Sequence, residues 1–171
     1  MNVFISVIAA ALLLAPQHPT MPKGMSHEEH MKQMEKDEAL KKRGAEAMRF
    51  DQDATTHHFK LMAAGGSIEV TVNNATDATT IAAIRTHLQS IAAEFSRGEF
   101  DKPFKTHGEV PPGVSVMRER SQKIAYRYDD APQGGAVRIS TKDAQALDAV
   151  HAFLRYQITE HKTGDPLDLQ R

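Results

Sequence analysis

The chain has no cysteine and no tryptophan among its 171 residues. Without thiols it cannot form disulfides, iron–sulfur clusters, a thioether-linked haem or a cysteine nucleophile, and no cysteine is present to carry a lipid anchor. Any metal site must therefore be built from nitrogen and oxygen ligands, with methionine sulfur as the one soft donor.

An excess of charge of either sign is also lacking. The 21 Lys and Arg residues nearly balance the 22 Asp and Glu residues, which leaves a formal net charge of -1. Nucleic acids and anionic membrane surfaces require a basic face, so neither is expected as a partner. The GxSxG, HExxH, Walker and GxGxxG signatures are missing too, and the sequence therefore gives no support for an enzyme.

The N-terminus carries a mainly apolar run, VFISVIAAALLLA, over residues 3–15. A membrane span needs about 20 apolar residues, whereas a run of this length is typical of a signal peptide. We expect residues 1–16 to be a signal peptide that delivers the protein to the periplasm or outside the cell, with no stable membrane anchoring after cleavage. An uncleaved anchor and a buried strand are the alternatives.

The rest of the chain divides by composition at residue 50. Residues 17–49 are expected to be a linker followed by an exposed helix, which begins with a capping box between Ser26 and Glu29. Residues 50–171 contain two similar units, each a hairpin of alternating apolar and polar residues with a Gly-Gly turn, followed by an amphipathic helix. The sequence predicts an α+β domain in which two ββα units form a four-stranded antiparallel sheet with two helices on one face.

The chain contains nine histidines, which are the commonest side-chain ligands for transition metals. His27, His30, Met31 and Met34 follow spacings that place them on one stripe of the N-terminal helix. Imidazole with thioether is a ligand set that suits copper. The alternative is that the methionines dock the helix while the histidines are solvated.

Further histidines fall on the predicted strands and helices of the domain. His57 and His58 start the first strand, where His57 is expected to face the core with Phe59 and His58 to face outward. His87 lies on the apolar face of the first amphipathic helix and is expected to be a core residue. His151 and His161 lie on the second helix, where the C-terminal end of the helix favours a protonated His161.

His107 lies in a long connection between the two units that contains three prolines. It is followed closely by Glu109, which makes the only local pair of imidazole and carboxylate in that connection. Because prolines stiffen a loop, a histidine placed on one is a better candidate for function than one on a smooth helix.

These patterns favour a metal-binding or metal-handling protein, with copper preferred to zinc because of the methionines. The expected ligands in the domain are His58, His107 and His161, with His57 and His151 as further candidates, and the His27/His30/Met31/Met34 stripe forms a second capture site. Since neutral imidazoles bind metals, the affinity is expected to fall below about pH 6.5. The alternatives are a non-catalytic envelope module that binds a protein partner, with structural histidines, and a haem-binding protein.

The segments THHF, HGEVPPGV and VHAFLRYQITEH, together with IRTHL and a closing TGDP, resemble those of a group of exported bacterial proteins. The resemblance covers about residues 26–168. It implies an exported α+β module with histidine-bearing segments, and it implies no particular activity.

Overall fold

The computed structural model of the protein describes residues 24–48 and 50–170. The expected signal peptide and most of the linker lie outside the described residues. The chain divides into two compact units within helix α1 (His27–Met48), the first ending at Glu35 and the second beginning at Lys36. The capping box at the start of α1 is confirmed, because Ser26 Oγ lies 2.7 Å from Glu29 Oε2 and 3.3 Å from Glu29 N.

The second unit is an α+β fold with a four-stranded antiparallel sheet, as the sequence predicts, and its strands lie in the order β1-β2-β4-β3. After α1 its elements are, in order, β1 (Thr55–Met62), β2 (Gly65–Val72), α2 (Ala78–Ser96), α3 (Asp101–His107), α4 (Val114–Glu119), a 3₁₀ turn (Ser121–Lys123), β3 (Ile124–Ala131), β4 (Gly134–Thr141) and α5 (Ala144–Glu160).

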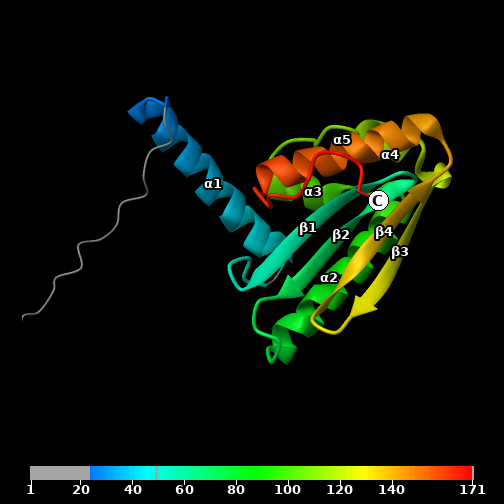
Figure 1. Ribbon diagram of the computed structural model, residues 1–171, viewed down its shortest axis with the longest axis horizontal. Helices are drawn as coiled ribbons and strands as arrows, with labels where there is room; N and C mark the ends of the chain where they lie inside the picture. The colour runs from blue at the N-terminus through cyan, green and yellow to red at the C-terminus, as the bar shows by residue number, and fades with distance from the viewer. Residues whose placement is uncertain (1–23, 49, 171) are drawn as a thin grey trace, which may run out of the picture. The chain divides into compact units, whose positions relative to one another are not determined.

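Each long helix covers mainly the hairpin of the other ββα unit. Helix α2 packs chiefly on β3 and β4, whereas α5 packs chiefly on β1 and β2, and both lie on the same face of the sheet (Figure 1). The core between helices and sheet therefore requires both halves of the repeat, since neither hairpin is covered by its own helix alone.

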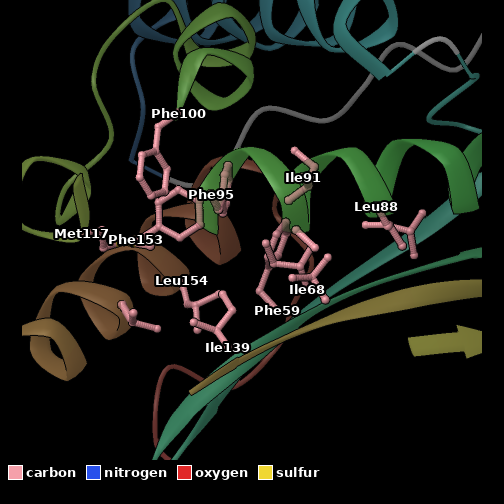
Figure 2. Packing of buried hydrophobic residues seen from close by; sticks show 14 of the residues in the cluster. Phe59, Ile68, Leu88, Ile91, Phe95, Phe100, Met117, Ile139, Phe153 and Leu154 are labelled. Atoms are coloured by element: carbon pink, nitrogen blue, oxygen red, sulfur yellow. The ribbon is translucent and has the colours of Figure 1, made fainter. Parts of the chain in front are cut away.

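Aromatic rings fill the centre of this core. Phe95 of α2 lies with its ring centroid 4.4 Å from that of Phe100 and 6.0 Å from that of Phe153 of α5, and it also meets Tyr126 of β3 edge-on (Figure 2). Phe95, Phe100 and Phe153 are each 1% exposed. The cluster thus joins both long helices to the sheet.

The expected Gly-Gly turns are wrong in position. The hairpin turns are residues 63–64 and 132–133, and each glycine pair instead begins the next strand. The reason is close packing at the sheet centre, where a Cβ on Gly134 would overlap the carbonyl oxygen of Val70 on the neighbouring strand. Likewise a Cβ on Gly66 would overlap the side chain of Leu154 on α5.

Gly134→Ala is therefore expected to lower the free energy of unfolding by about 3 kcal/mol, because the neighbouring β2 backbone cannot move aside without breaking the sheet. Urea unfolding measures this. Gly164→Ala is the control, because its Cβ would meet nothing within 4 Å and only its φ of +76° resists alanine, at a cost of about 1 kcal/mol. Equal losses for the two variants would contradict the steric explanation.

The long connection between the units is also not the loop that its prolines suggested. It contains α3 and α4, with His107 as the last residue of α3. Pro103 is the third residue of α3, in the first turn, where a missing N–H costs no helical hydrogen bond. Gly108 then ends the helix at a φ of +75°, in the left-handed region that glycine tolerates.

Candidate functional site

The alternation of β1 divides the first two histidines of the domain between the two faces of the sheet, as expected. His57 points to the interior together with Phe59 and Leu61, which are 4% and 0% exposed. His58 faces outward, where its Nδ1 donates to Asp165 Oδ1 over 2.8 Å. The same carboxylate accepts from the backbone N–H of Phe59, so this pair fastens the C-terminal segment to β1.

His107 and His161 reach the same interior region from the ends of two helices. His107 ends α3, and the guanidinium of Arg43 on α1 holds that turn by donating to the carbonyl oxygens of Thr106 and His107. His161 caps the C-terminus of α5, where its backbone N–H donates to Gln157 O. Three imidazoles from β1, α3 and α5 are thereby brought together.

The three histidines line a partly open cavity of about 70 Å³, which is room for an ion or for very few water molecules. His87 of α2 and Met48 of α1 line it as well, and Gln157 and Lys102 supply further polar atoms. The remaining wall consists largely of core side chains such as Phe59 and Phe153. Among the described residues that line the cavity, none is Asp or Glu.

The rings pack against one another. His57 and His161 lie parallel, with centroids 6.1 Å apart and planes 10° apart. His107 meets His161 edge-on, with a centroid distance of 5.1 Å. Phe50 stacks on His57 and meets His87 at a near right angle, so the same ring contacts both imidazoles.

Burial keeps these imidazoles neutral. It lowers the pKa of His57 and of His87 to about 4, and the nearby His58 and Lys102 respectively add to the effect. Burial, followed by the neighbouring His107 and His57, lowers the pKa of His161 to about 3. The expectation of a protonated His161 is therefore wrong, because loss of hydration at this helix end outweighs the attraction of the helix dipole.

Three polar atoms in this region are buried without a hydrogen-bond partner: His57 Nε2, His107 Nδ1 and Gln157 Nε2. His107 Nε2 lies 3.0 Å from Gln157 Oε1, which can only accept, so Nε2 carries the proton. The other ring nitrogen of His107 then presents a lone pair. Buried polar atoms normally have partners, so this free nitrogen of His107, in a residue that lines the cavity, is a candidate ligand atom.

In the described part of the chain, no group of three or more His, Asp or Glu side chains is arranged to hold a metal ion. The rings of His57 and His161 lie nearly parallel with their centroids 6.1 Å apart, and they do not belong to such a group. A metal bound here would require at least one of these rings to rotate.

The other predicted ligands lie elsewhere. His151 Nε2 donates to the carbonyl oxygens of Met62 and Gly65, and it fastens the first hairpin to α5. Glu109 accepts from Tyr156 Oη over 2.6 Å. Its expected pairing with His107 is replaced by a contact between the His107 and Tyr156 rings, whose centroids are 5.0 Å apart.

The stripe His27, His30, Met31 and Met34 lies in the first unit and is continuous on one helix. Met31 is 43% exposed. The structure describes this segment by itself, so the stripe remains a separate predicted capture site.

Two residues that line the cavity are not among the ligands that the sequence predicts. His87 was expected in the core, and its direction toward the sheet is confirmed, but its helix periodicity could not indicate that other histidines meet it. Met48 is the last residue of α1, and no spacing in the sequence connects it with His57 or His161.

No family model matches the chain, and no curated protein or solved structure shows significant similarity to it. Among the described helices, none is long and apolar enough to cross a membrane.

Proposed function

We propose that this chain is an exported metal-handling protein that binds a transition-metal ion in this partly open cavity, with His57, His107 and His161 as ligands. The observation that carries the proposal is the meeting of three neutral imidazoles at one cavity, His107 buried and His57 and His161 partly buried, two of them with a ring nitrogen that lacks a partner. Metals bind the neutral form of histidine, which burial favours here.

The size of the cavity limits what it can bind. Pockets for small organic molecules are about 300 Å³ or larger, whereas this one is about 70 Å³. An ion therefore fits better than an organic ligand, and the haem alternative finds no space in this cavity.

Titration of the full chain with Zn(II), Cu(II) and, without oxygen, Cu(I) tests the proposal, with binding measured by calorimetry or chelator competition. We expect one ion per chain at the cavity, beyond any that the predicted stripe binds, and His107→Asn or His161→Asn should each weaken binding at the cavity at least about tenfold, because each removes a direct ligand. Since burial lowers the pKa of His57 and His161 to about 4 and 3, affinity should persist well below pH 6.5.

Two controls accompany this titration. His58→Asn removes an imidazole outside the cavity and should leave the affinity unchanged. The double variant His27→Asn/His30→Asn removes the two histidines of the predicted stripe, so it distinguishes metal binding at the stripe from metal binding at the cavity. Undiminished binding in both His107→Asn and His161→Asn would rule out the cavity as the site.

A second candidate is a non-catalytic envelope module in which the histidines are structural. The parallel stack of His57 and His161 favours this second function, because two rings that pack face to face contribute to the core without a metal ion. This function predicts that added metal leaves the melting temperature unchanged, whereas a specifically bound ion raises it by mass action.

A further inference from the structure

The charges around the cavity constrain which ion it can bind. Its lining contains four imidazoles and Met48, and no Asp or Glu from the described residues. Among the described lining residues, Lys102 is the one with a cationic side chain. It forms an ion pair with Glu94 and donates a hydrogen bond to Ser90 Oγ over 2.6 Å. Any charge on a bound ion is therefore left uncompensated by its direct ligands.

The cost of that charge depends strongly on its size. The free energy of transferring an ion from water to an apolar interior grows with the square of the charge, so a divalent ion costs about four times as much as a monovalent one. Divalent sites in proteins usually offset this with thiolates or carboxylates. This cavity offers neither, which favours a monovalent ion.

The thioether of Met48 also favours a monovalent ion. Met48 is 8% exposed and lines the cavity together with His57, His87 and His161. Thioethers are soft, uncharged donors that select Cu(I) over harder divalent ions. The methionine therefore adds a ligand without adding charge.

The number of free donors is also small. Two imidazole nitrogens, His57 Nε2 and His107 Nδ1, are buried without partners. Cu(I) is a soft, monovalent ion that is stable with few ligands, so it does not require a complete tetrahedron. Two imidazoles and one thioether suffice for it.

We infer that the ion for this cavity is monovalent copper, bound by the thioether of Met48 together with the imidazoles of the proposed site, His57, His107 and His161. This inference rests on the proposed function, because it assigns the oxidation state of the metal that the cavity takes. It also separates this site from the exposed stripe on the first unit, whose ligands remain in contact with water.

The test uses the full chain with the stripe removed by His27→Asn, His30→Asn, Met31→Leu and Met34→Leu. Cu(I) affinity is measured without oxygen by competition with a chromophoric chelator, and Zn(II) affinity is measured by calorimetry. We expect Cu(I) to bind at least about a hundredfold more tightly than Zn(II). Met48→Leu, which preserves volume, should weaken Cu(I) about tenfold and change Zn(II) little.

Met117→Leu is the matched control, because Met117 is a fully buried methionine that does not line the cavity. It should leave Cu(I) affinity unchanged. X-ray absorption at the copper edge of the chain without the stripe, with Met48 intact, should detect a sulfur neighbour, which tests Met48 even where its variant is unstable.

The outcomes distinguish the two proposals. Equal or tighter binding of Zn(II), or a copper site without sulfur, overturns the assignment of Cu(I) while leaving a metal site in place. Absence of binding for every ion overturns the proposed function and the Cu(I) assignment together.

Discussion

Lowering the pH from 7 to 4 is expected to unfold the protein, because three buried histidines must become charged. Their ordinary pKa is 6.5, and burial lowers it to about 4 for His57 and His87 and to about 3 for His161. Between these values the unfolded chain binds more protons than the folded chain, so stability falls as the pH falls. The loss begins near pH 6.5 and continues to about pH 4.

The expected size of this effect is large. Each histidine contributes about 3 kcal/mol over that interval if it titrates independently. Three of them together approach the entire stability of a typical domain, about 5–15 kcal/mol. Urea unfolding at pH 7, 6, 5 and 4 gives the slope, and therefore the number of protons taken up on unfolding.

Variants identify the source of the slope. His161→Gln should reduce proton uptake by about one, because glutamine does not titrate. His27→Gln is the control, since His27 is exposed in the first unit, and it should retain the full pH dependence. A stability that stays constant from pH 6.5 to 5 would show that the cavity histidines are not held neutral.

Phe95→Ala is expected to cost about 4 kcal/mol of unfolding free energy, the largest effect of any single substitution considered for this chain. Phe95 is 1% exposed and contacts Phe100, Tyr126 and Phe153. Its removal leaves a void and loses ring contacts with two helices and the sheet at once.

Phe104→Ala is the matched control for this loss. Phe104 is 48% exposed, so truncation of the same side chain there should change stability by less than about 1 kcal/mol. Thermal and urea unfolding of both variants at pH 7 make the comparison. Similar losses for the two would contradict the assignment of Phe95 to the centre of the core.

The sequence by itself determined the class of fold and the direction of many side chains. The period-two pattern of both hairpins and the period of the two long helices predict the four-stranded α+β domain, because burial of one face imposes these repeats. The same pattern placed His57 inside and His58 outside. The alternation of inward and outward residues is a local property of a strand, so the sequence of one segment is enough to predict it.

Predictions from the local sequence pattern were wrong where close packing or short helices determine the structure. The sequence pattern predicts that the glycine pairs form turns, but they begin central strands, because the adjacent backbone and helix leave no space for a Cβ. The connection around His107 folds as α3 and α4, since Pro103 falls in a first turn that tolerates it.

Only the tertiary structure decided which histidines meet. His57, His107 and His161 come from β1, α3 and α5, and their encounter depends on the strand order and on the crossing of each helix onto the other hairpin. The neutral state of the rings was decided there too, because desolvation depends on what surrounds an imidazole and not on its neighbours in sequence. Spacing identified the candidate ligands, and packing selected the ones that share a cavity, with Met48 and His87 beside them.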